Sequence, residues 1–157
     1  MKKFLIMAMA VLGIATQAFA GDNVNRHFNK GYAADVQLTS TDVNMFHITS
    51  SHGWAFGNGL YLGGGAGFGA EWFGKVAESD VHYVPSLFVN ARWSILNAKV
   101  SPFVDLKATQ YIDLTAGKPN YGLTPSVGLD MGLVSLSVGY SLRGERSAMQ
   151  VGLGFCF

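Results

Sequence analysis

The chain has 157 residues, of which 49% are hydrophobic and only 13% charged, against a charged share of about 25% in a typical soluble domain. Without Lys2 and Lys3, which we assign below to a signal peptide, 9 Lys and Arg (11 less 2) stand against 10 Asp and Glu, so no basic surface is offered to nucleic acid. The single cysteine, Cys156, excludes an intramolecular disulfide and a cysteine-rich metal site.

The first 20 residues have the pattern of a cleaved signal peptide. Lys2 and Lys3 precede an apolar stretch from Phe4 to about Ala15, and Ala18-Phe19-Ala20 has the small-x-small form that signal peptidase accepts. A transmembrane helix would need about 20 apolar residues. We therefore predict a signal peptide over residues 1–20 and one mature domain over residues 21–157.

Alternation of apolar and polar residues continues through the mature chain and predicts strands. No apolar run after the signal is long enough for a spanning helix, whereas each alternating segment has the roughly 9 to 11 residues of a tilted membrane strand. The eight predicted strands run from Gly31 to Thr41, Val43 to Phe56, Leu60 to Phe73, Val81 to Leu96, Lys99 to Asp113, Tyr121 to Met131, Val134 to Arg143, and Ser147 to Phe157.

The fourth and fifth segments show the clearest division into two faces. Odd positions from Leu87 to Ile95 are apolar and should meet lipid, and in the fifth segment the even positions take that role. A two-residue turn at Asn97-Ala98 would pair Arg92 with Phe103 and join inward residues to inward residues.

Which side chains of the second segment face lipid depends on the length of the turn between the second and third segments. A three-residue turn at residues 57–59 puts Phe46, Ile48, Trp54 and Phe56 on the lipid face, whereas a two-residue turn reverses them. In the third segment Gly63, Gly65, Gly67 and Gly69 should face inward. They leave either a slot for an acyl chain or room for bulky inward rings such as Phe88, Phe103 and Tyr111.

The last seven residues place four apolar side chains on one face and end the chain with an aromatic residue: Val151, Leu153, Phe155 and Phe157. This arrangement resembles the terminal signal that the outer-membrane assembly machinery reads, and we assign that role to Phe155 and Phe157. Because backbone polar groups must all be paired in hydrocarbon, the eight strands predict an all-β, eight-stranded antiparallel up-and-down transmembrane barrel. Its short turns, and both termini, should lie in the periplasm.

Several motifs are similar to the small outer-membrane β-barrel proteins common in Bacteroidetes. The resemblance rests on His52-Gly53-Trp54, the glycine-rich run from Leu62 to Phe68 with Glu71-Trp72-Phe73, Val84-Pro85, the segment from Ser101 to Asp105, and Pro125-Ser126-Val127-Gly128. It implies a Gram-negative outer-membrane location, with lipid and lipopolysaccharide as surroundings, but no particular activity. From the size of the chain we expect a monomer.

Charged residues on the inward face are the candidate functional set: Asp35, Glu71, Arg92, Asp105, Lys107, Asp130 and Arg143. An eight-stranded barrel is only just wide enough inside for side chains to fill it. Mixed charges in that space favour a hydrogen-bonded network that plugs the lumen, since isolated buried charges are costly. A narrow channel for ions or water, or a small-molecule transporter, is the alternative.

Catalytic and metal chemistry have little support in the sequence. His47 and His52 fall on opposite faces of a regular strand, so no metal site is predicted, and we expect no cofactor. Ser79, Asp80 and His82 form one local set near an outer loop, where a base beside a carboxylate and a hydroxyl would suit acyl transfer. We therefore expect a non-enzymatic barrel with a structural or weak interaction role, and a lipid-modifying enzyme at the rim is the second alternative.

Overall fold

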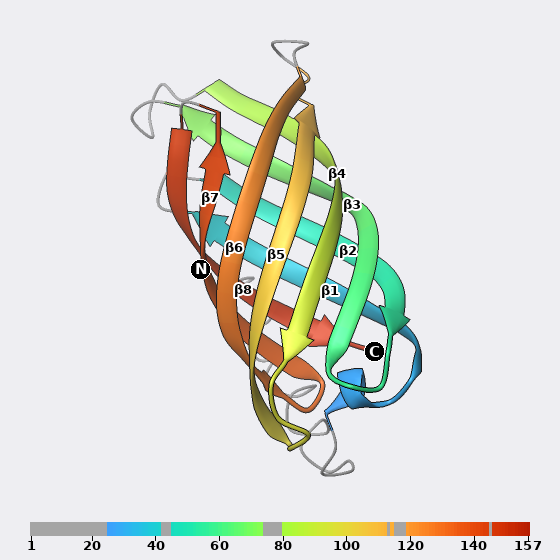
Figure 1. The fold of residues 1–157 in the computed structure, drawn as a ribbon. Helices are drawn as coiled ribbons and strands as arrows, with labels where there is room; N and C mark the ends of the chain where they lie inside the picture. Colours follow the sequence, from blue (N-terminus) through green and yellow to red (C-terminus); the bar gives the residue numbers. More distant parts are fainter. Residues whose placement is uncertain (1–24, 42–44, 74–79, 113, 115–118, 145) are drawn as a thin grey trace, which may run out of the picture.

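The computed structural model describes residues 25–41, 45–73, 80–112, 114, 119–144 and 146–157, so the predicted signal peptide lies outside the described residues. The chain forms a closed barrel in which each strand pairs antiparallel with the next and β8 closes on β1 (Figure 1). The strands are β1 (Gly31–Thr41), β2 (Met45–Ala55), β3 (Leu60–Phe73), β4 (Asp80–Ser94), β5 (Val100–Ile112), β6 (Pro119–Met131), β7 (Val134–Arg143) and β8 (Arg146–Cys156). The predicted eight-stranded up-and-down barrel is confirmed.

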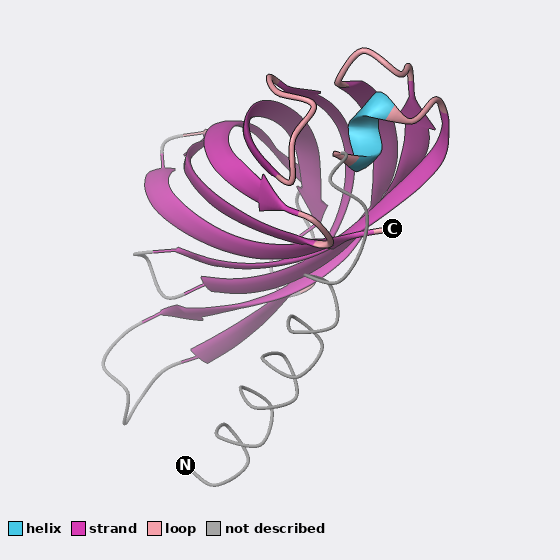
Figure 2. Ribbon diagram, turned by 90° about the horizontal axis from the view of Figure 1, so that it is seen from below, coloured by secondary structure: helices cyan, strands magenta, loops and turns pink. Residues whose placement is uncertain are grey.

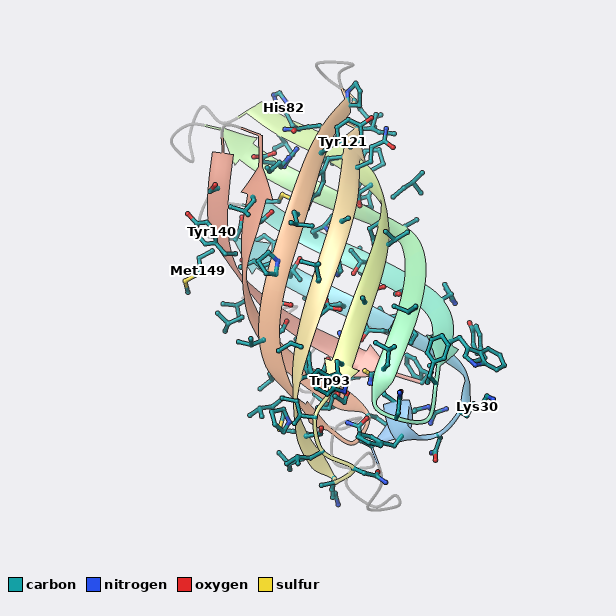
Figure 3. All side chains as sticks on the ribbon, in the orientation of Figure 1. Lys30, His82, Trp93, Tyr121, Tyr140 and Met149 are labelled. Carbon is teal, nitrogen blue, oxygen red and sulfur yellow. The ribbon has the colours of Figure 1, made fainter. Side chains whose placement is uncertain are left out.

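The wall of the barrel is apolar outside and polar inside. On β4, Leu87, Val89 and Trp93 are exposed, whereas Arg92 between them is buried at 2% exposure. Figure 3 shows Tyr140 and Met149 projecting outward, with Trp93 toward one end and His82 and Tyr121 at the other. The outward and inward faces that alternation predicted for β4 are confirmed. Apolar residues face out and polar residues face in, which is the reverse of the arrangement in a soluble protein.

The register between β4 and β5 differs from the predicted one by two residues. Arg92 lies opposite Asp105, not opposite Phe103. The predicted two-residue turn is wrong because residues 95–99 form a wider connection, in which the Leu96 N–H donates to Ser101 Oγ at 3.1 Å. A shift by two residues preserves the side-chain period of 2, so the inward and outward faces are unchanged.

The turn between β2 and β3 decides the face that the sequence left open. Gly57 and Gly59 have φ values of 82° and 86°, a left-handed conformation that glycine adopts without steric cost. The Phe56 N–H donates to the Leu60 carbonyl at 2.9 Å, which makes a three-residue turn. The outward set that this turn predicted is confirmed, since all four side chains are exposed: Phe46, Ile48, Trp54 and Phe56.

The inward glycines of β3 leave room for bulky side chains from neighbouring strands. A Cβ at Gly65 would lie 3.0 Å from the Phe88 ring, and one at Gly67 would lie 2.8 Å from the His47 ring. Phe103 and Tyr111 are accommodated in the same way beside glycines of β6. The rings therefore occupy the space that an acyl chain would need.

A short segment before β1 is folded against one mouth of the barrel. It contains a single 3-10 turn, η1 (Arg26–Phe28), which lies beside the connecting turns at that end (Figure 2). The Gly59 N–H donates to the His27 carbonyl at 3.2 Å and ties the segment to the β2–β3 turn. Among the residues that the structure describes, no helix is both long and apolar enough to cross a membrane.

Candidate functional site: the lumen

The seven charged residues singled out from the sequence all lie inside the barrel, and the contacts described among them fall into separate groups. Asp35, Arg92, Asp105 and Asp130 gather in the half of the lumen nearest η1. Glu71 and Arg143 pair near the opposite end. Lys107 lies between the two groups on β5. The lumen is therefore best described in three layers.

Arg92 is the centre of the layer next to η1. Its Nη1 donates to Asp35 Oδ2 at 3.1 Å and lies 3.7 Å from Asp130 Oδ1, and its Nε is 4.0 Å from Asp105 Oδ1. Cys156 also donates to Asp35 Oδ2, at 3.2 Å. Three carboxylates around one guanidinium leave this layer with excess negative charge. The β4–β5 register creates the arrangement, because it sets Asp105 directly across from Arg92.

The N-terminal segment supplies further partners for these carboxylates. Asn25 Nδ2 donates to Asp130 Oδ2 at 3.2 Å, and His27 Nδ1 lies 2.9 Å from Ser94 Oγ and 3.7 Å from Asp130 Oδ2. The His27 ring also packs on Tyr61, with 5.3 Å between ring centroids. Asn25 and His27 are 4% and 3% exposed. Together they cover this mouth of the barrel.

The middle layer joins β1, β5 and β7 through neutral and cationic groups. Lys107 Nζ donates to Gln37 Oε1 at 2.9 Å, and Gln37 Nε2 donates onward to Ser137 Oγ at 3.0 Å. The ammonium of Lys107 also lies 4.8 Å from the centroid of the Phe88 ring. The middle of the lumen is thus crossed by a chain of side chains from wall to wall.

The third layer is built around an ion pair. Arg143 Nη1 donates to Glu71 Oε2 at 3.2 Å, and the guanidinium lies 4.3 Å from the centroid of the Tyr111 ring. Ser86 Oγ and His47 Nε2 are 2.9 Å apart and lie on the side of this pair that is nearer the middle layer. A pocket of about 30 Å³ remains beside Glu71, Arg143 and His47, which is room for one or two water molecules.

The three inward cations whose side chains are described, Arg92, Lys107 and Arg143, each lie over an aromatic ring as well as beside a polar partner. Arg92 is 4.4 Å from the centroid of Phe103, just as Lys107 lies over Phe88 and Arg143 over Tyr111. Cation–π contacts of this kind stabilise a desolvated charge. Sequence reasoning gave both sets of residues an inward face but did not pair them, because the pairing depends on register and rotamer. The ring contacts and hydrogen bonds hold these three charges in fixed positions. The side chains that make them leave little space in the lumen for a solute.

The set proposed at the rim is only partly described. Ser79 lies outside the described residues, and only the backbone of Asp80 is described, opposite Phe73. His82 is opposite the inward Glu71, so it lies on the lumen side of β4. Within the described ranges, no cluster of three or more His, Cys, Asp or Glu side chains has the arrangement of a metal site.

These features define a class of protein: an eight-stranded, antiparallel, membrane-type β-barrel with an apolar exterior and an interior lined by polar and aromatic side chains. Among solved structures, the chain is similar to the N-terminal β-barrel domain of OprF from Pseudomonas aeruginosa, with a TM-score of 0.51 and 12% identity over 82% of this chain and 100% of that domain. The de novo designed protein TMB2.3, solved by NMR, matches at a TM-score of 0.48 and 14% identity, over 81% of this chain and 94% of that one.

No family model and no curated protein sequence matches the chain. The likeness to the OprF domain supports the fold, and nothing among the comparisons supports the narrower resemblance to the Bacteroidetes proteins.

Proposed function

We propose that this chain is an integral outer-membrane protein with a non-enzymatic, structural role, and that its lumen is closed by its own side chains. The observation that carries the proposal is the three-layer filling of the lumen, in which Arg92, Lys107 and Arg143 are each held by a polar partner and an aromatic ring. Fixed, paired charges stabilise a closed barrel, whereas a permeation path needs polar groups that water can reach.

Insertion into a membrane follows from the outer wall. Large apolar side chains from all eight strands are exposed there, among them Leu38, Ile48, Leu62, Val89, Leu106, Val127, Leu136 and Val151. In water such a surface would aggregate, and in a bilayer it meets acyl chains. We place both termini in the periplasm because the two longest intervals between strands, residues 74–79 and 113–118, are at the opposite end of the barrel. We expect lipid and lipopolysaccharide as surroundings and the assembly machinery as the partner during insertion. The monomer needs no second copy to close its sheet.

Planar-bilayer recordings separate this proposal from the channel alternative. The purified protein is inserted into bilayers, and insertion is checked in parallel vesicles by heat-modifiable gel mobility. A closed lumen predicts no stepwise conductance from inserted protein. Reproducible single-channel steps from the wild-type chain would overturn the closed lumen and support the narrow channel.

A further inference from the structure

Three polar side chains form a connected trio on the outer wall, where β1 and β2 otherwise present mainly apolar groups. Tyr32 Oη is 2.5 Å from His52 Nδ1, and Ser50 Oγ is 3.0 Å from His52 Nε2. The Tyr32 and His52 rings stack with 6.1 Å between centroids. Tyr32 is 64% exposed, His52 is exposed and Ser50 is partly exposed. Polar groups that face lipid are costly and are found mainly where they have a function.

The trio has a hydrogen-bond donor left over. A neutral imidazole has one donor and one acceptor nitrogen, so one hydroxyl donates to His52 while the other accepts from it and keeps its own proton. No other hydrogen bond of either hydroxyl is found within the described chain. The trio can therefore donate outward to a group that only accepts, such as an ester carbonyl or a phosphate oxygen.

The wall around the trio is open to such a group. On the two neighbouring strands, the residues directly opposite His52 are Ala34 and Gly64, so apart from the stacked Tyr32 ring the facing positions add no more than a methyl group. Trp54, on the same face of β2, marks the level where aromatic rings favour the membrane interface. Since a tilted membrane strand rises roughly 2.5 Å per residue along the membrane normal, Ser50 lies about 10 Å deeper than Trp54.

A cation completes the arrangement at the level of the lipid headgroups. Lys30 is exposed and comes two residues before Tyr32, at the end of the barrel that carries η1 (Figure 3). From the membrane surface inward, the wall therefore offers an ammonium and then the hydroxyl and imidazole groups of the trio. A phospholipid presents its phosphate and then its ester carbonyls in the same order.

We propose that Lys30, Tyr32, His52 and Ser50 form a binding site for one phospholipid of the periplasmic leaflet, with Lys30 at its phosphate and the trio at an ester carbonyl. This inference rests on the proposed outer-membrane location. Binding is favoured over ester hydrolysis because the β1–β2 and β2–β3 ladders are continuous past His52. Their paired backbone N–H groups leave no pair of free backbone donors that could form an oxyanion hole of the usual kind for acyl transfer.

The test is a titration of the detergent-solubilised protein with phosphatidylglycerol, followed by native mass spectrometry. We expect Tyr32→Phe combined with His52→Leu to weaken binding of the first lipid about tenfold, and Lys30→Gln about threefold, as the loss of one or two hydrogen bonds or of one ion contact implies. Tyr140→Phe is the matched control, because Tyr140 is also an outward tyrosine, 49% exposed, and it should bind as the wild type does.

Equal lipid binding by all variants overturns the site. Two other results also overturn it: release of free fatty acid by the wild type, which would make the trio catalytic, and a dimer in lipid nanodiscs that the double variant abolishes, which would assign the face to a second copy. Heat-modifiable mobility confirms that each variant is folded. If the wild type fails to insert into vesicles at all, the proposed function fails. If the wild type inserts normally but the variants bind the first lipid as tightly as it does, only the lipid site is refuted.

Discussion

Leu106 and Val100 lie on the same outward face of β5 and differ mainly in depth. Their exposed fractions are 46% and 51%, so area alone would assign them similar environments. Val100 is the first residue of the strand, whereas Leu106 is at its middle. At the scale of the single residue, position along the membrane normal should therefore decide how well a charge is tolerated.

We predict that Leu106→Arg lowers the free energy of unfolding by about 2–4 kcal/mol, and Val100→Arg by no more than about 1 kcal/mol, because the cost of a charge on the lipid face falls toward the interface. Urea unfolding in lipid vesicles measures both. A similar cost at the two positions would show that the bilayer does not surround this strand as we describe.

Arg92 holds together the three carboxylates of the layer next to η1. Arg92→Met should lower the free energy of unfolding by about 3–5 kcal/mol, because removal of one partner leaves buried charges uncompensated. Adding Asp35→Asn should recover part of this loss, since one of those charges is then removed as well. Unfolding in vesicles provides the comparison, and an Arg92→Met variant as stable as the wild type would contradict the role assigned to Arg92.

At the scale of the element, η1 and its flanking residues act as a cover for one mouth of the barrel. Asn25 and His27 are buried against Asp130 and Ser94, whereas Arg26 between them is exposed. The segment is held by a few hydrogen bonds and one ring contact, not by a strand ladder. Its opening should therefore be local and should not require the barrel to unfold.

Replacing Asn25 and His27 together with alanine should loosen this cover, with a loss of about 1–3 kcal/mol from the partners left unsatisfied. The Gly59 amide reports the change, because it donates to the His27 carbonyl and should exchange its hydrogen faster. Arg26→Ala is the control within the same segment. Equally fast exchange in that control would mean that the buried contacts do not hold the segment in place.

At the scale of the whole molecule, the end of the chain both closes the barrel and carries the proposed assembly signal. The Phe157 N–H donates to the Ala34 carbonyl at 2.7 Å, and the Phe157 carbonyl accepts from the Ala34 N–H at 3.0 Å. These bonds use the backbone alone. The Phe157 side chain, 51% exposed on the outer wall, is thus not required for the closing ladder.

Phe155→Ala combined with Phe157→Ala should therefore reduce the amount of barrel assembled in cells several-fold while refolding into detergent remains close to normal. Phe46→Ala with Phe56→Ala removes two outward rings elsewhere on the wall, 47% and 46% exposed, and serves as the control. Heat-modifiable mobility of both samples is the measurement. Normal assembly of the terminal variant in cells would remove the signal role.

The architecture could be predicted from the sequence because the pattern that encodes it is local. Alternation in β4 and β5 identified the strands and their faces, since a residue's side of the sheet depends only on its parity. The inward positions of Asp35, Glu71 and Arg92 follow from that period of 2, whereas the strand count and the antiparallel order follow from the short connections between the alternating segments. The predicted ends of the sixth and seventh strands, Met131 and Val134, are also confirmed, since these two residues pair with each other.

Contacts between distant residues were decided only by the closed tertiary structure. The β4–β5 register depends on how Ser101 contacts the connection, so the sequence alone misplaced Arg92 relative to Asp105. The docking of His27 against Ser94 and the stacking of Lys107 on Phe88 join residues far apart in the chain. Alternation predicts which side of the wall a residue faces. Only the closed wall, whose curvature and register fix the distances across the lumen, determines which residue it meets there.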